Sequence, residues 1–341
     1  MLRIQPAITC LVLMLAAGCT VGYGSRARLS GLPEAGSAHR AGTPPAAAVL
    51  PAPAELASHL RAVNRAVYTD QLVSFRYVVE SLAERLEIHR VSAADVGRTL
   101  VWDLKDSAYV AAARAEGPAE AIRVVLYAID STSGVPAAPL LEIGAIDMYP
   151  QNAVISGPDS KLTMRYVVSG RGADQTIYAD FTGVDGGRDC SHCVRVAGWV
   201  TDGTTRVDFS ASYAFVAEGA VRFTATERVA SQPDVLQLDA TLQDSSIHSA
   251  ARFTFRGDSL ESRALLMWRE DGTIDGTFAV RLNGRPFLDA DRDLTTITGP
   301  QNRPVTPDED MAMRQLYALT HGLVQDVEMP VFLTFNCGCA Q

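Results

Sequence analysis

The chain has 341 residues, of which 47% are hydrophobic and 20% are charged, and its formal net charge at pH 7 is −9. This composition is typical of a packed globular protein and excludes a chain that is disordered throughout. Because the net charge is negative and no basic tract occurs, the composition argues against nucleic acid as a partner.

The first 19 residues are typical of a secretory signal. One basic side chain, Arg3, precedes an apolar run over residues 7–17. The run is shorter than the roughly 20 residues that a membrane-spanning helix needs, so we expect a signal peptide over residues 1–18. The sequence Leu15-Ala-Ala-Gly-Cys19 resembles the lipobox of bacterial lipoproteins, although Ala16 stands where the pattern prefers leucine.

This resemblance implies that the thiol of Cys19 carries acyl chains such as palmitate and that the signal is removed before it. Two or three acyl chains hold a protein stably at a membrane. We therefore expect a lipid-anchored protein of the bacterial cell envelope. Thr20, not aspartate, follows Cys19, which favours the outer over the inner membrane. The alternative is an ordinary signal peptide that leaves Cys19 unmodified.

Residues 20–54 are rich in Gly, Ala, Pro and Ser and are expected to form a flexible tether. Residues 55–97 are expected to form a helical lead-in, because apolar side chains recur there every three or four residues. Thr69-Asp70 interrupts this pattern, so we expect two helices over residues 55–91, the second capped by Asp70. They either pack on their own sheet or form a partner-binding hairpin.

From residue 98 to 341 the pattern predicts a β-rich domain, because apolar and polar residues alternate. We expect a hairpin at 99–110, strands at 122–129 and 140–148, and about ten strands between Lys161 and Asp291. The pairs Asp202-Gly203, Asp271-Gly272 and Asn283-Gly284 favour type I′ turns and hence sequential antiparallel hairpins. Strand twist accumulates over so many strands, so the meander should curve into a half-barrel, barrel or sandwich.

The C-terminal part begins with a helix start signal. Thr306 and Glu309 match a capping box, with proline between them at the first helical position, which predicts a helix over residues 306–322. The apolar run at 331–335 predicts a final strand. The fold class is therefore mainly β, with N-terminal helices, a large curved antiparallel meander, and a C-terminal helix and strand.

Four cysteines remain once the signal and the lipidated residue are set aside: Cys190, Cys193, Cys337 and Cys339. An even number in an oxidising compartment favours disulfides. Pairing within 337–339 would close a strained ring, so we expect cross-pairing of the two groups. A four-thiolate zinc site is an alternative, although the second spacing is short for it. A thioredoxin-like redox pair is a further alternative, and covalent haem is rejected because Val194, not histidine, follows Cys193.

Asp289, Asp291 and Asp293 alternate in the manner of the first ligands of an EF-hand. The sixth position of that loop is Leu294 instead of glycine, and the twelfth is Pro300 instead of glutamate. A calcium site here is a weak candidate, and a solvated strand end is the alternative. The six histidines are scattered and no hydrolase or nucleotide-binding motif occurs, so we predict no catalytic residue and no cofactor.

Two functions remain open. The first is a structural or partner-binding envelope protein. The second is a carrier of a lipid or another hydrophobic ligand on the concave face of the sheet, because the outline of a helix followed by a long meander resembles lipoprotein-carrier folds. A carrier needs an apolar cavity on the order of several hundred Å³, whereas a structural protein fills that space with its own side chains.

Overall fold

The computed structural model of this protein describes residues 53–85, 96–113, 116–130, 135–136, 138–154, 161–171, 176–186, 193–217, 220–243, 245–269, 274–290 and 297–323. The predicted signal peptide, lipobox and tether, and the predicted strand at 331–335, lie outside these residues.

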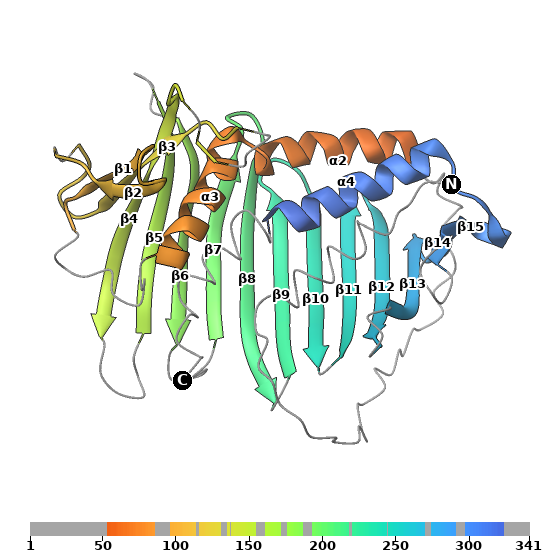
Figure 1. Ribbon diagram of the computed structural model, residues 1–341. Coiled ribbons are helices and arrows are strands. Elements are labelled where there is room, and N and C mark those ends of the chain that lie inside the picture. The colour runs from red at the N-terminus through yellow and green to blue at the C-terminus, as the bar shows by residue number, and fades with distance from the viewer. Residues whose placement is uncertain are drawn as a thin grey trace.

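One sheet of 16 strands forms the body of the molecule (Figure 1). Its strands are β1 (Thr99–Asp103), β2 (Ala108–Ala111), β3 (Ile122–Tyr127), β4 (Glu142–Val154), β5 (Lys161–Gly170), β6 (Ile177–Gly186), β7 (Cys193–Thr201), β8 (Arg206–Ala217), β9 (Ala220–Val229), β10 (Val235–Gln243), β11 (Ser246–Phe255), β12 (Asp258–Trp268), β13 (Ile274–Leu282), β14 (Arg285–Ala290), β15 (Ile297–Gly299) and β16 (Arg303–Pro304). From β3 to β16, each strand pairs antiparallel with the next in sequence, and the sheet remains open between β16 and β2. The predicted mainly β class and the ten strands between Lys161 and Asp291 are confirmed.

The N-terminal corner of the sheet departs from the sequential pattern. The predicted hairpin is present, with Trp102 opposite Tyr109. However, β1 then pairs parallel with β3, through Thr99 and Arg123. The β1–β2 ladder continues one residue beyond β2, where Ala112 N–H donates to the carbonyl of Thr99. Strand β3 consequently lies beside the first strand of the hairpin and not the second, which the turn signals alone did not predict.

The turns bear out one predicted type I′ turn and correct another. Asn283 and Gly284 both have positive φ, 51° and 75°, as a type I′ turn requires. At Asp202-Gly203 the glycine alone has positive φ, so the predicted turn type is wrong there. The carboxylate of Asp202 instead accepts hydrogen bonds from the backbone N–H groups of Thr204 and Thr205 at 2.8 and 2.7 Å, which stabilises a longer loop. Asp271-Gly272 lies outside the described residues.

Three α-helices are present in the described part of the chain: α2 (Pro53–Val67), α3 (Asp70–Arg85) and α4 (Pro307–Leu323), with a short 3₁₀-helix η2 (Pro300–Asn302). The expected cap of α3 is wrong by one residue, because Thr69 Oγ1 accepts from Leu72 N–H at 3.3 Å. The predicted capping box of α4 is confirmed. Glu309 Oε2 accepts from Thr306 N–H at 2.9 Å, and Thr306 Oγ1 accepts from Glu309 N–H at 3.3 Å.

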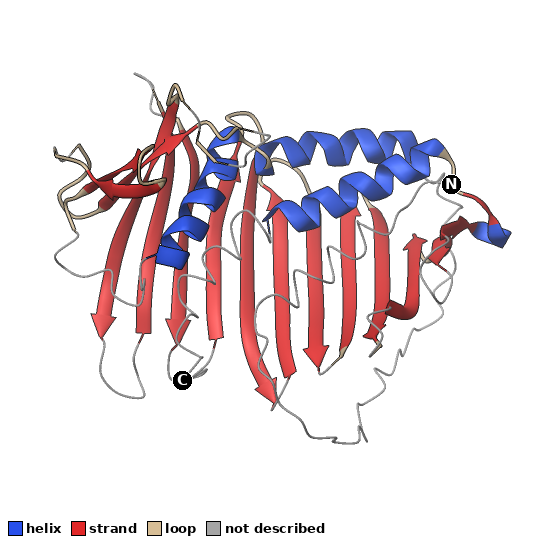
Figure 2. Cartoon of the chain, viewed as in Figure 1, coloured by secondary structure: helices blue, strands red, loops and turns tan. Residues whose placement is uncertain are grey.

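All three helices lie on one face of the sheet (Figure 2), which we call the inner face. Helix α2 buries the predicted stripe of Leu56, Leu60, Val63 and Val67. Phe75 of α3 is fully buried, and its ring meets Tyr166 and Phe181 edge-on at 6.0 and 5.4 Å. The helices therefore pack on their own sheet. None of the described helices combines the length and the apolar character needed to cross a bilayer.

Helix α4 packs alongside α2 (Figure 1). Ala312 and Leu316 of α4 are buried in the same core as α2. Asn64 of α2 donates to the backbone carbonyl of Gln315 at 2.8 Å and to its side-chain oxygen at 2.9 Å. The C-terminal helix is thus attached to the N-terminal one by both apolar and polar contacts.

Candidate functional site

Helix α2 crosses the ends of the central strands, the upper ends in Figure 1, and contacts successive hairpins. Glu55, in its first turn, accepts from Arg256 in the β11–β12 turn at 2.8 Å. One turn later, His59 contacts Asp234, which precedes β10, and Val63 then lies over β8 and β9. The first of these pairs is exposed and contributes little stability, because surface ion pairs are screened by water.

The pair of His59 and Asp234 is buried, in contrast. The distance from Nε2 to Oδ2 is 2.6 Å, and the side chains are 9% and 0% exposed. A carboxylate can only accept, so Nε2 carries the hydrogen. The imidazole also stacks on Phe255, with ring centres 5.8 Å apart. The second oxygen of Asp234, Oδ1, is buried and has no hydrogen-bond partner among the described residues.

A small cavity lies beside this pair, between α2 and the sheet. Its volume is about 10 Å³, and its lining includes Val63, Glu227, Asp234, Leu236 and Phe253. This is room for about one water molecule. Glu227 is 3% exposed, so two acidic side chains border the cavity within an otherwise apolar interface. The space directly beneath α2 is therefore filled by side chains.

Below this cavity, away from α2, the inner face is lined by small residues. Alternation along the strands places the inward-facing side chains in rows across the sheet. The row that contains Leu236 and Phe253 is made of large residues. The next two rows carry small side chains on β10 to β12, and Leu238 and Phe223 are the large residues that end them on the β9 side. We call this region the hollow, and its floor consists of Ala240, Ser249, Ala251, Ser262 and Ala264.

Large side chains surround the floor of the hollow. Tyr213 and Phe223 pack against each other on the β8–β9 side, with ring centres 5.8 Å apart. Phe278 lies next to Ala264 on the β13 side. Ile247 and Leu266, below the floor, form an apolar cluster separate from the main core. The floor spans three strands, which is about 10 Å, and its two rows are about 7 Å apart.

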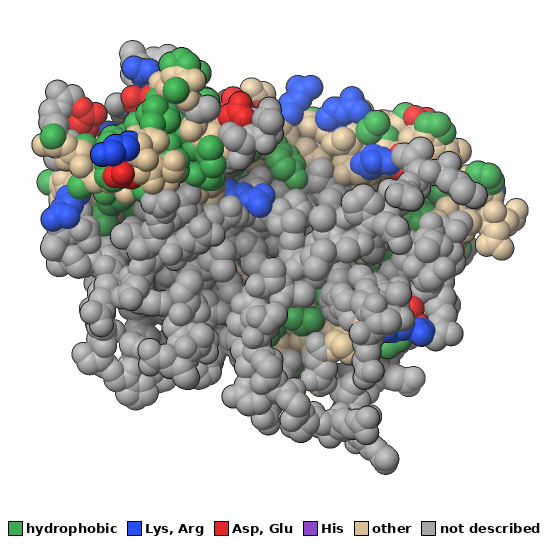
Figure 3. Space-filling model, in the orientation of Figure 1, with side chains coloured by type: hydrophobic (Ala, Val, Ile, Leu, Met, Phe, Trp, Pro, Cys, Tyr) green, Lys and Arg blue, Asp and Glu red, His purple; other side chains and the backbone are tan. Residues whose placement is uncertain are grey.

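The hollow is more accessible on one side than on the other. Ala240 is buried, whereas the four floor residues on β11 and β12 are half-buried. Below α2 and α4, Figure 3 shows hydrophobic atoms together with backbone and other atoms, and a few charged ones. This arrangement suits an elongated apolar group that lies across the strands.

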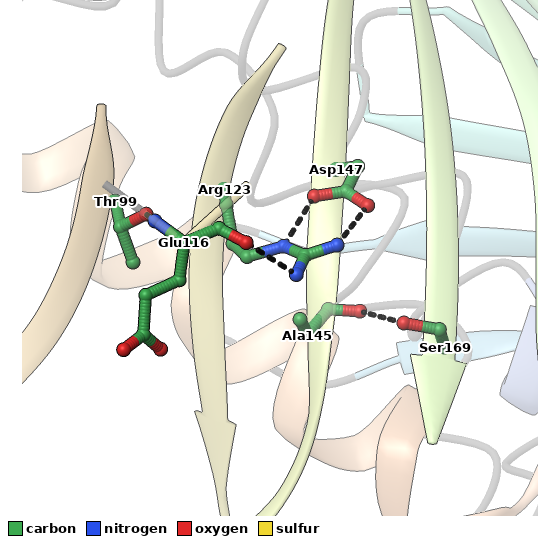
Figure 4. Close-up of polar contacts among 6 residues, drawn as sticks. All are labelled: Thr99, Glu116, Arg123, Ala145, Asp147 and Ser169. Carbon is green, nitrogen blue, oxygen red and sulfur yellow. Dashed lines mark hydrogen bonds and ion pairs between the residues drawn. The ribbon is translucent and has the colours of Figure 1, made fainter. Parts of the chain in front are cut away.

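A second polar cluster lies at the N-terminal corner of the sheet (Figure 4). Arg123 donates to both carboxylate oxygens of Asp147 at 2.7 Å and to the carbonyl of Glu116 at 3.1 Å. Glu116 N–H in turn donates to Thr99 Oγ1 at 2.8 Å. The hydrogen bonds to Asp147 raise the pKa of Arg123 above its usual value. Because the guanidinium is held by strands and loop together, we assign this cluster to joining β1, β3 and β4.

The predicted site residues lie mostly outside the described part of the chain. This holds for Cys19, for three of the four remaining cysteines (Cys190, Cys337 and Cys339), and for Asp291 and Asp293. Cys193 begins β7 and is 6% exposed, and Asp289 belongs to β14. Within the described ranges, no group of histidine, cysteine or acidic residues is arranged to hold a metal ion. Disulfide pairing, zinc and calcium therefore stay predictions.

The small cavity bordered by Glu227 and Asp234 was not predicted, although the sequence contains a signal for it. His59 follows Leu56 by three residues and so lies on the apolar stripe of α2. Glu227 occupies an inward position in an alternation otherwise made of Phe223, Ala225 and Val229. A polar residue at a position where the helix or strand periodicity requires an apolar side chain indicates a buried polar group.

Comparison with protein-family models, with curated proteins and with solved structures finds no match to this chain.

Proposed function

We propose that this protein is a lipid-anchored protein of the bacterial cell envelope that binds a hydrophobic ligand on the inner face of its sheet. The observation that carries the ligand-binding part is the hollow. Packed protein interiors leave few voids, so sheets that face helices normally carry side chains large enough to fill the space. Five small floor residues with large apolar ones around them instead suit a ligand that supplies further apolar surface.

The lipid anchor is supported by the lipobox-like segment that ends at Cys19. Its test is the replacement Cys19→Ser in the full chain, expressed in a bacterium and followed by membrane fractionation and intact-mass measurement. We expect the wild-type protein in the membrane fraction, with acyl chains on the mature N-terminus. We expect the variant to lose this modification. A wild-type mass without acyl chains would contradict the anchor.

Ligand binding is tested on the chain from Thr20 onward, which contains every described residue, secreted into a bacterial periplasm and purified without detergent. Organic extraction and mass spectrometry should then release a lipid or other hydrophobic molecule in a near-stoichiometric amount. A clean extract from folded protein would contradict the carrier function.

The second candidate is a structural or partner-binding envelope protein. It is favoured by the interface beneath α2, where the cavity is about 10 Å³ and the protein fills the space with its own helix. A clean extract would place this function first, and the next experiment would be chemical cross-linking in intact cells to find an envelope partner.

A further inference from the structure

The outer face of the sheet, opposite the helices, carries a group of arginines on β7 to β9. All the described helices lie on the inner face, so none of them covers these strands from outside (Figure 2). We call this region the arginine patch, and its arginines are Arg195, Arg206, Arg222 and Arg228. Their neighbours along the strands face the core, so alternation directs all four side chains outward, and all four residues are exposed.

Two arginines of the patch are ion-paired. Arg206 donates to Asp208 at 2.8 Å, and Arg222 is paired with Asp239. Arg206 also lies over the ring of Trp199, with the guanidinium carbon 4.6 Å from the ring centre. These contacts hold the two guanidinium groups in place, but their charges are balanced by the aspartates.

The other two arginines, Arg195 and Arg228, have no ion-pair or hydrogen-bond partner in the part of the chain that the structure describes. Arg228 lies opposite Asp208 in the register, but the carboxylate of Asp208 accepts from Arg206 instead. Four arginines and two aspartates give the patch a net charge of +2, in a chain whose net charge is −9. Charge complementarity therefore favours an anionic partner.

Hydroxyl groups fill the surface between the arginines. Ser210 and Ser212 of β8 lie opposite Thr226 and Thr224 of β9. Ser212 Oγ and Thr224 Oγ1 are 2.7 Å apart and hydrogen-bonded, so these hydroxyls share the outer face. A hydroxyl both donates and accepts, as the hydroxyls of a sugar do. An anionic bilayer presents mainly acceptors and would repel the two aspartates of the patch, whereas sugar hydroxyls also donate to them.

We propose that the arginine patch binds an anionic glycan, whose carboxylate or phosphate groups accept hydrogen bonds from Arg195 and Arg228. The sugar hydroxyls bond to the serines and threonines between these two arginines. Arg195 lies opposite Ser212, and Arg228 is two residues beyond Thr226, so the two arginines stand at opposite corners of the hydroxyl surface. By strand geometry their Cα atoms are about 17 Å apart, which suits a chain of several sugars. The site is on the opposite face from the hollow and does not depend on a ligand there.

The test compares tetragalacturonic acid, which carries a carboxylate on each sugar, with maltotetraose, a neutral chain of hexoses of the same length. Each is titrated calorimetrically into the chain from Thr20 onward. We expect tetragalacturonic acid to bind at least about tenfold more tightly at low salt, because contacts from guanidinium to carboxylate are charge-assisted. Its binding should weaken as the salt concentration rises. Equal binding of the two sugars, or no binding of either, would overturn the proposal.

Matched variants test the location. Arg195→Gln and Arg228→Gln should each weaken binding of tetragalacturonic acid about tenfold. Arg263→Gln is the control, because it removes another exposed arginine of the outer face, on β12, and should change binding by less than about twofold. Ser210→Glu adds a negative charge within the hydroxyl surface and should abolish binding, whereas Thr277→Glu adds the same charge at an exposed outer position of β13 and should not. Circular dichroism melting curves establish that each variant is folded.

Two further outcomes would overturn the proposal. If Arg263→Gln weakens binding as much as Arg195→Gln does, the whole face attracts the glycan and the patch is not the site. Vesicles of phosphatidylcholine and phosphatidylglycerol test the lipid alternative by co-sedimentation with the same chain. Co-sedimentation that requires Arg195 and Arg228, without binding of tetragalacturonic acid, would replace the glycan by a lipid surface.

Discussion

The buried pair of His59 and Asp234 should contribute measurably to the attachment of α2 to the sheet. His59→Ala leaves the carboxylate of Asp234, whose side chain is 0% exposed, without its donor. Leaving a buried charged group without its hydrogen-bond donor costs about 3 kcal/mol or more. Asp234→Ala removes the buried charge together with its hydrogen bond, and should cost about 2–3 kcal/mol. If both single variants lose the same His59–Asp234 contact, the double variant should lower the free energy of unfolding by about 3–4 kcal/mol. The coupling energy between the two side chains is then about 2 kcal/mol or more.

The assay is equilibrium unfolding in urea, followed by circular dichroism, for the wild type, the two single variants and the double variant. The same helix offers a control in Glu55 and Arg256, an exposed pair whose coupling energy should stay below about 0.5 kcal/mol. A coupling energy for His59 and Asp234 as small as that of the control pair would refute the reasoning.

Three further predictions follow from the fold. Phe75→Ala should destabilise the protein by about 4 kcal/mol in urea unfolding, because it removes a fully buried ring. The control is Val73→Ala, at a 41% exposed position of the same helix, which should change stability by less than about 0.5 kcal/mol. Hydrogen bonds from Arg303 lower the pKa of Glu309 from its ordinary 4.5. Glu309→Gln should therefore lower the free energy of unfolding by about 1–2 kcal/mol above pH 4.5. This difference between the variant and the wild type should disappear as the pH falls through the lowered pKa. Urea unfolding at several pH values measures this, and a difference that grows in acid would contradict it. If the four cysteines form disulfides, protein purified from the periplasm without reductant should show no reactive thiol in a thiol assay and no bound metal by elemental analysis. Stoichiometric zinc would instead favour a thiolate site made of Cys190, Cys193, Cys337 and Cys339.

Most of the fold could be predicted because its information is local. The alternation of Val207, Phe209, Ala211 and Tyr213 is sufficient to define β8 and the face that it buries. The capping box of α4 was predicted for the same reason, since its two partners are three residues apart. Where neighbouring side chains compete for one role, as Thr69 and Asp70 do at the start of α3, residue types alone did not identify the cap.

The candidate site could not be predicted because it depends on register between strands distant from α2. His59 and Asp234 are 175 residues apart, and no spacing rule joins them. Similarly, small residues on three strands form a hollow only when pairing aligns them, as Ser249 aligns with Ala240 on one side and Ala264 on the other. A slip of two residues in one hairpin would keep every alternation and break up the floor.

The crossing of α2 over the sheet has a consequence for cooperativity. From β4 to β16, the described strands pair only with their neighbours in sequence, so this part of the sheet alone resembles a linear array in which local unfolding need not spread. Helix α2 touches β7 and β8, the residues just before β10, and the β11–β12 turn, and it holds the C-terminal helix as well. One segment of 15 residues thereby couples distant parts of the array. Detachment of α2 should therefore convert a single unfolding transition into several, beginning at the strands nearest the two ends of the sheet.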